Sequence, residues 1–253
     1  MALDQSFDGI KQDKAEMSFL EHIEELRLRL IYVGLGIVVG MIISFFVLDF
    51  VVTEVLLRPA REVNLVLQNL RPFGQFTLYF EVAFTLGLIL SIPNVVYQFW
   101  KFIEPALGMG ERKYIKFIVF FTTFSFLAGM VFAYYLILPA TLGVAVTIGT
   151  DQIKNEFAVD EYLSIVYSVT LATATIFELP MLSYALAKIG ILKPEYMTKY
   201  RRHAIVILFI VAAVLTPPDP VSQSIMVVPL ILLYELSIII VKRVKANREN
   251  SES

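Results

Sequence analysis

The sequence predicts an all-α membrane protein with six transmembrane helices, and three observations support this fold class. Of the 253 residues, 57% are hydrophobic and only 17% are charged, which is too apolar for the surface of a soluble domain. The apolar residues fall in six long runs with short connections. Lysines and arginines gather on alternate connections, a pattern typical of polytopic membrane proteins.

The first four apolar runs are long enough to cross a bilayer, because a spanning helix needs about 20 residues. They cover 30–48, 82–100 with 76–80 before it, 117–138, and 163–187, which is interrupted only by Glu178.

The last two runs, 204–215 and 225–241, are shorter and predict a hairpin of two short helices. The segment 216–220 (TPPDP) between them cannot continue a helix, so it predicts a tight turn. We expect both helices to cross the membrane; a re-entrant pair is the alternative.

Positive charge predicts the orientation of the chain. Seventeen of the 21 lysines and arginines lie on one set of alternate segments, which the positive-inside rule assigns to the cytoplasm. We expect a polar cytoplasmic tail at 1–16, a transmembrane domain at 17–242 in the cytoplasmic (inner) membrane, and a second cytoplasmic tail at 243–253. The outer loops 51–75 and 139–161 carry apolar residues and predict short helices over the outer surface.

Composition and missing motifs exclude several functions. With a formal net charge of −2, the chain has no overall positive electrostatic field to attract nucleic acid. The absence of cysteine excludes disulfides and thiolate metal sites. His22 and His203 are far apart and have no partners at metal-ligand spacing. Because nucleotide-binding and hydrolase motifs are also absent, we expect no enzyme activity, no metal and no cofactor.

Two acids near the predicted cytoplasmic surface are candidate binding residues. Glu25 lies on an amphipathic helix, 17–29, that leads into the first span, and Glu111 begins the third helix. Both also have structural interpretations. Glu25 can pair with Arg29 one turn later, and Glu111 can offset the helix dipole.

Four segments, in order, resemble the TatC family, the receptor subunit of the twin-arginine protein translocase. They are 22–29 (HIEELRLR), 97–112 (YQFWKFIEPALGMGER), 177–180 (FELP), and 215–219 (LTPPD) with Ser222 and Gln223. The resemblance covers 17–242 and implies a concave, glove-shaped bundle.

This resemblance implies a receptor for folded cargo whose signal peptides carry consecutive arginines. It maps recognition onto Glu25 and Glu111, with Arg27 and Phe102 in support. Carboxylates suit this ligand because a guanidinium donates two parallel hydrogen bonds. The implied partners are single-span TatA/TatB-type subunits, assembled for export driven by the proton-motive force, and further copies of the chain in a homo-oligomer.

Glu178 lies near the middle of its apolar run, where an isolated charge is costly. Pro180 predicts a bend in the same helix. The resemblance assigns Glu178, Thr216 and Gln223 to contacts with partner subunits. The structural alternatives are a hydrogen-bonded acid that fastens helices and ordinary helix caps. A proton-coupled transporter of small molecules, with Glu178 and Glu235 as proton carriers, is the alternative function.

Overall fold

A computed structural model describes residues 19–104, 115–147, 156–216 and 220–252. The predicted tail 1–16 lies outside these ranges. The long helices are α1 (Phe19–Ser44), α4 (Gly74–Ile103), α5 (Ile115–Phe132), α7 (Val159–Ile176), α10 (Arg201–Leu215) and α11 (Pro220–Glu252). Shorter helices prolong or join them: η4 (Ala133–Ile137), α6 (Leu138–Thr147), α8 (Leu179–Lys188) and α9 (Pro194–Lys199).

Within the described residues, five helical segments are long and apolar enough to cross a membrane. They are Glu21–Ser44, Gly74–Ile103, Lys116–Thr147, Val159–Lys188 and Ser222–Asn247. The sixth apolar helix, α10, has 15 residues and is about 22 Å long at the helical rise. The prediction of an all-α membrane bundle with a short fifth helix is therefore confirmed.

The prediction that the last helix is also short was wrong. α11 has 33 residues, and its candidate span alone has 26. Within the segment 243–253, predicted as a cytoplasmic tail, the helix continues to Glu252. The apolar run ends at Val241, but the following lysines, arginines and alanine are good helix formers, and no glycine or proline stops the helix there.

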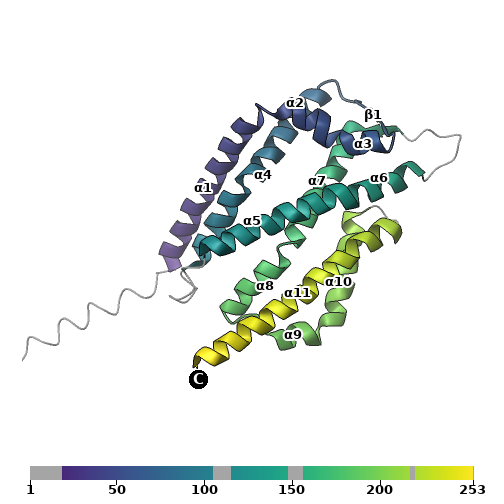
Figure 1. Ribbon diagram of the computed structural model, residues 1–253. Coiled ribbons are helices and arrows are strands. Elements are labelled where there is room, and N and C mark those ends of the chain that lie inside the picture. The colour runs from purple at the N-terminus through teal and green to yellow at the C-terminus, as the bar shows by residue number, and fades with distance from the viewer. Residues whose placement is uncertain (1–18, 105–114, 148–155, 217–219, 253) are drawn as a thin grey trace, which may run out of the picture.

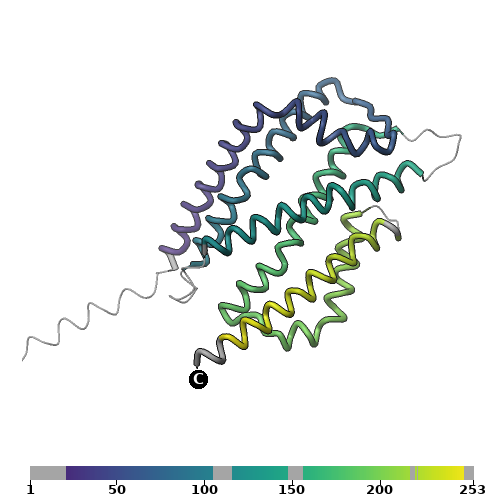
Figure 2. The backbone as a smooth tube through the Cα atoms, viewed as in Figure 1, coloured from purple at the N-terminus to yellow at the C-terminus, as the bar shows by residue number. Residues whose placement is uncertain are grey.

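The helices form the predicted concave bundle (Figure 1). α1 and α4 pack along each other, and α8 packs against α11. A cavity of about 320 Å³ lies between the π-helical turn η1 (Val51–Leu56), α4, α5 with η4, and α7. The long helices run from one end of the bundle to the other. The start of α1 and the end of α11 lie at the same end (Figure 2).

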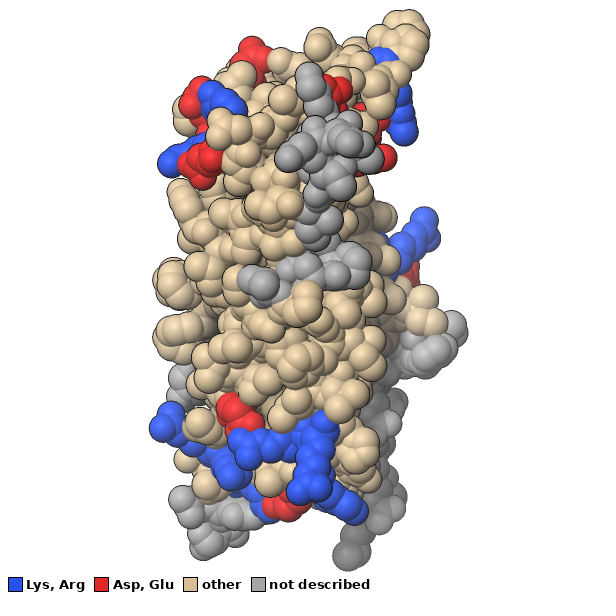
Figure 3. All heavy atoms as spheres, turned by 90° about the vertical axis from the view of Figure 1, so that its right-hand side faces the viewer, with Lys and Arg blue, Asp and Glu red and all other residues tan. Residues whose placement is uncertain are grey.

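Basic residues gather at the end of the bundle where α11 finishes. Figure 3 shows lysines and arginines crowded at the lower end of one face, whereas the middle of that face is mostly uncharged. The basic residues of α8, α9, α11 and the start of α10 include Lys188, Lys199, Arg201, Arg202, Lys242, Arg243 and Lys245. This distribution fits an apolar belt bounded by a basic membrane surface.

Two glycines let α1 and α4 approach closely. A Cβ on Gly40 would lie 2.5 Å from the carbonyl oxygen of Gly87, which leaves no room for a side chain. Ser44 Oγ donates to the carbonyl of Ala83 at 3.0 Å beside this contact. Small residues at a helix crossing allow this backbone approach in membranes.

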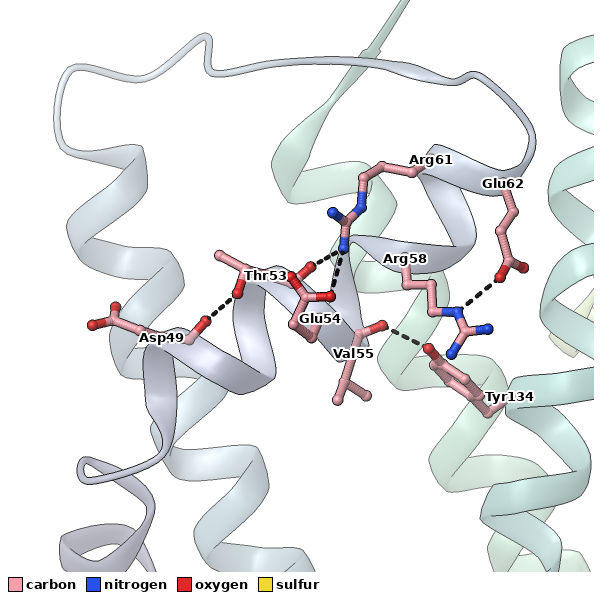
Figure 4. A network of polar contacts seen from close by, with 8 residues as sticks. All are labelled: Asp49, Thr53, Glu54, Val55, Arg58, Arg61, Glu62 and Tyr134. Atoms are coloured by element: carbon pink, nitrogen blue, oxygen red, sulfur yellow. Dashed lines mark hydrogen bonds and ion pairs between the residues drawn. The ribbon is translucent and has the colours of Figure 1, made fainter.

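Short helices are present between α1 and α4, as predicted for the connection 51–75 (Figure 4). They are α2 (Leu48–Phe50), the π-helical turn η1 (Val51–Leu56) and α3 (Arg58–Glu62). We call them the outer cap. Tyr134 of η4 donates its hydroxyl to the carbonyl of Val55 at 2.8 Å, and Tyr162 of α7 donates to the carbonyl of Leu56.

Two short strands were not predicted. β1 (Val66–Gln68) pairs in parallel with β2 (Glu156–Ala158), with Val66 opposite Glu156. This pair ties the connection after the outer cap to the segment before α7.

The two tyrosine hydroxyls are expected to hold the outer cap in place. Changing both Tyr134 and Tyr162 to phenylalanine keeps the rings and removes two hydrogen bonds, each worth about 1 kcal/mol. The melting temperature in detergent should fall by about 4–8 °C, since about 2–4 °C per kcal/mol is usual at this size. The matched control is Tyr135→Phe, whose ring is exposed. Equal melting of the double variant and the control would contradict the prediction.

Candidate functional site

Glu25 lies near the beginning of α1 and is held by a relay of hydrogen bonds to α4. Arg29 Nη2 donates to Glu25 Oε1 at 2.8 Å, and Arg29 Nη1 donates to Gln98 Oε1 at 3.0 Å. The side chains of Glu25 and Arg29 are only 18% and 24% exposed. The structural pairing of Glu25 with Arg29 is therefore present, and Gln98 fixes it to the neighbouring helix.

The second carboxylate oxygen of Glu25 has a different environment. Oε2 is buried and accepts no hydrogen bond from the part of the chain that the structure describes. A buried carboxylate oxygen without a donor is unfavourable, because it has lost its hydrogen bonds to water and has no protein hydrogen bond to replace them. The carboxylate is thus fixed through one oxygen and lacks a donor at the other.

Phe102 lies beside the same stretch of α1. Its ring stacks on the imidazole of His22, with centroids 4.3 Å apart and planes inclined by 16°. His22 is three residues before Glu25, so both side chains belong to neighbouring positions on one side of the helix. Arg27 is exposed on α1. The structure therefore brings Phe102 close to the Glu25 region, while Glu111 lies outside the described residues.

The predicted bend in the fourth apolar segment is confirmed. α7 ends at Ile176 and α8 begins at Leu179, with Pro180 in its first turn. The break frees the carbonyl of Phe177, and Ser125 Oγ on α5 donates to it at 2.7 Å. Glu178 sits in the break, and its Oε1 is buried without a hydrogen-bond partner among the described residues.

Threonines on α5 and α7 are further buried polar groups in the helices next to this break. Four hydroxyls on these two packed helices are buried and make no hydrogen bond within the described ranges: those of Thr122, Thr123, Thr170 and Thr173. Together with Glu178, at the break that follows α7, we call these residues the polar stripe. Sequence reasoning missed it, because single threonines in apolar runs are unremarkable until two helices bring them together.

Thr216 and Gln223 serve the hairpin between α10 and α11. Thr216 Oγ1 donates to the carbonyl of Ala212 at 2.9 Å at the end of α10, and Gln223 Nε2 donates to the carbonyl of Phe209 at 3.1 Å. Thr216 therefore has the helix-end role considered for it, whereas Gln223 does not cap α11 but joins it to α10. Neither hydrogen bond reaches Glu178. Glu235 of α11 is ion-paired with Arg201 of α10, which links the same two helices.

Comparison with known proteins identifies the family. The sequence model described as Sec-independent protein translocase protein (TatC) matches residues 21–229. The chain belongs to the TatC family. The TatC protein of Blattabacterium sp. subsp. Periplaneta americana is 34% identical over 91% of this chain and 97% of its own length. Bacillus subtilis TatCy is 32% identical over 94% of both chains.

Solved structures agree with this assignment. Two crystal structures of a twin-arginine translocase receptor TatC, one of them in DDM, match with TM-scores of 0.75 and 0.76. They are 32% and 33% identical and cover 89% and 87% of this chain and 100% and 98% of their own.

TatC-family membership makes this chain a membrane component of Sec-independent protein transport, the Tat pathway, and not an enzyme. A protein-translocase family also replaces the small-molecule transporter considered from the sequence. Six of the seven predicted site residues lie in described ranges, and all seven lie within the matched residues 21–229.

Proposed function

We propose that this TatC-family chain is the receptor that binds twin-arginine signal peptides on the cytoplasmic face of the inner membrane. The observation that carries the proposal is the Glu25 carboxylate, which Arg29 and Gln98 fix in place and whose Oε2 lacks a donor in the described structure. The crystal structures that match are of proteins named as twin-arginine translocase receptors.

Guanidinium chemistry fits this carboxylate. Each carboxylate oxygen has two lone pairs, so one arginine of the peptide can donate its two parallel N–H groups to Oε1 and Oε2 of Glu25 while Arg29 keeps its own hydrogen bond to Oε1. The second arginine is assigned to Glu111. Partial burial strengthens these pairs relative to exposed ion pairs, because water screens them less. Phe102, stacked on His22, lies on the side of α1 that carries Glu25, and Arg27 is an exposed cation on the same helix, assigned a supporting role.

The rest of the proposal concerns orientation and partners. The basic end of the bundle is cytoplasmic, as the positive-inside rule requires, so both termini are cytoplasmic. Single-span TatA/TatB-type subunits bind at the polar stripe with Glu178 and at the hairpin with Thr216 and Gln223. Several copies of the chain join in the receptor complex. Partners are needed because a bundle with an internal cavity of about 320 Å³ cannot enclose a folded cargo.

The test measures signal-peptide affinity by fluorescence anisotropy on the purified chain in nanodiscs. The change is Glu25→Gln, and the matched control is Glu24→Gln, which removes the same charge from an exposed neighbour. Glu25→Gln is expected to raise Kd for an Arg-Arg peptide about tenfold or more, because a charged hydrogen-bond pair is lost. A Lys-Lys peptide should bind weakly to every variant, since ammonium cannot form the bidentate pair.

Two results would contradict the proposal. An unchanged Kd for Glu25→Gln would remove Glu25 from the site. Equal losses in Glu25→Gln and Glu24→Gln would reduce the effect to general surface charge.

A further inference from the structure

A basic groove lies away from Glu25, between α5, α8 and α11. The groove has a volume of about 530 Å³. Its apolar walls include Phe117 and Phe121 of α5 and Ile240 of α11, and its two cations are Lys188 of α8 and Arg243 of α11. None of the described residues that line it is acidic. It therefore combines an apolar surface with two positive charges.

The groove changes character along its length because of the helices that build it. On α11, Ile240, Arg243 and Asn247 recur at helical spacing, so one side of the helix turns from apolar to polar toward its end. Lys188 is the last residue of α8, and its ammonium lies 5.9 Å from the centroid of the Tyr184 ring. Both cations thus stand where apolar helix gives way to the basic end of the bundle.

The α5 wall is a pair of aromatic side chains. Phe117 and Phe121 are one turn apart, with ring centroids separated by 4.3 Å, and they are 62% and 41% exposed. Neighbouring Ile118 is buried against Trp100 and Ala185, which fixes the face that α5 turns outward. A flexible hydrocarbon chain can lie along such rings, which stand next to the two cations.

We propose that this groove binds one anionic phospholipid. The phosphate lies between Lys188 and Arg243, and an acyl chain lies along Phe117, Phe121 and Ile240. Basic pockets between transmembrane helices suit lipid head groups in this way. A zwitterionic choline lipid is disfavoured because its cation would face two positive charges, and inorganic phosphate has no chain for the apolar wall. This site does not depend on signal-peptide binding.

The neighbouring side of α11 offers a matched comparison. A second pocket between α9 and α11 is lined by Lys199, Lys242 and Lys245, but there Glu195 pairs with Lys245. It lacks the aromatic wall, since its lining comes only from α9 and α11. The same number of positive charges can therefore be removed beside the proposed site without touching it.

The experiment measures lipid retention by native mass spectrometry of the delipidated full chain. The probes are phosphatidylglycerol, phosphatidylcholine with the same acyl chains, and inorganic phosphate. The double variant Lys188→Gln/Arg243→Gln is compared with Lys199→Gln/Lys242→Gln. We expect the first pair to lose one bound phosphatidylglycerol and to raise its apparent Kd about tenfold, and the second pair to resemble the unmodified chain.

A phosphatidylglycerol with a photoactivatable acyl chain provides an independent measurement. It should label the peptide that contains Phe117 and Phe121, and Lys188→Gln/Arg243→Gln should reduce this labelling. Equal retention by the two double variants, equal binding of phosphatidylcholine, displacement by inorganic phosphate at millimolar concentration, or labelling elsewhere would each overturn the proposal.

Discussion

Replacing Gly87 by leucine is expected to prevent α1 from packing on α4 and to remove most of the folded protein. A Cβ at Gly87 would lie 2.6 Å from the backbone nitrogen of Met41 and 2.8 Å from its Cα. These are backbone atoms of a neighbouring helix, so no side-chain rotation relieves the clash. Overpacking typically costs 1–3 kcal/mol, and a clash with rigid backbone lies at or above the top of that range.

The matched control is Gly34→Leu. A Cβ on Gly34 meets no heavy atom within 4 Å in the described structure, and it lies on the same α1 helix as Gly40. The measurement is the yield of monodisperse protein by size-exclusion chromatography, together with its melting temperature. Gly87→Leu should lower the yield at least tenfold, while Gly34→Leu should match the unmodified chain. Similar yields for both variants would show that the helix contact tolerates the side chain.

The second large effect is expected at Glu178, through partner binding. Its Oε1 is buried without a donor in the described residues. A partner helix that supplies donors there would satisfy groups that lack them in the isolated chain. Glu178→Ala should therefore lower crosslinking to a single-span subunit at least tenfold, while Glu178→Gln, which keeps hydrogen-bonding groups, should retain most of it.

Leu182 is a suitable crosslinking position. It lies one turn after Glu178 and is 44% exposed. Because the chain has no cysteine, a cysteine introduced at this position is the only one available for crosslinking. The control is Thr175→Ala, because the Thr175 hydroxyl already donates to the carbonyl of Leu171. Equal crosslinking of Glu178→Ala and Thr175→Ala would leave Glu178 with a structural role only.

The bundle was predictable where the hydrophobic effect acts along the chain. Spans follow from runs of apolar residues, and the bend follows from Pro180, because both depend on local chemistry. The length of α11 was not predicted, because the end of an apolar run indicates where a helix leaves the membrane and not where the helix itself ends. The pairing of β1 with β2 escaped for another reason: three-residue strands about 90 positions apart are defined only by the folded bundle.

In the candidate site, contacts within one helix were predictable from the sequence, whereas contacts between helices were not. Glu25 with Arg29 is a one-turn spacing on a single helix, so the sequence was sufficient to suggest it. Gln98 and Ser125 were missed because their contacts join different helices, and the register of α1 on α4 depends on the close approach at Gly40 and Gly87. No pattern in one helix specifies that register.

The joining of α1 to α4 also has a mechanical consequence. The two helices are fastened near Asn94, at the two glycines and at Ser44, and α4 alone is about 45 Å long. The two helices are therefore expected to move together as one rigid body. A tilt of α1 is expected to carry α4 with it, and with both helices the outer cap that connects them.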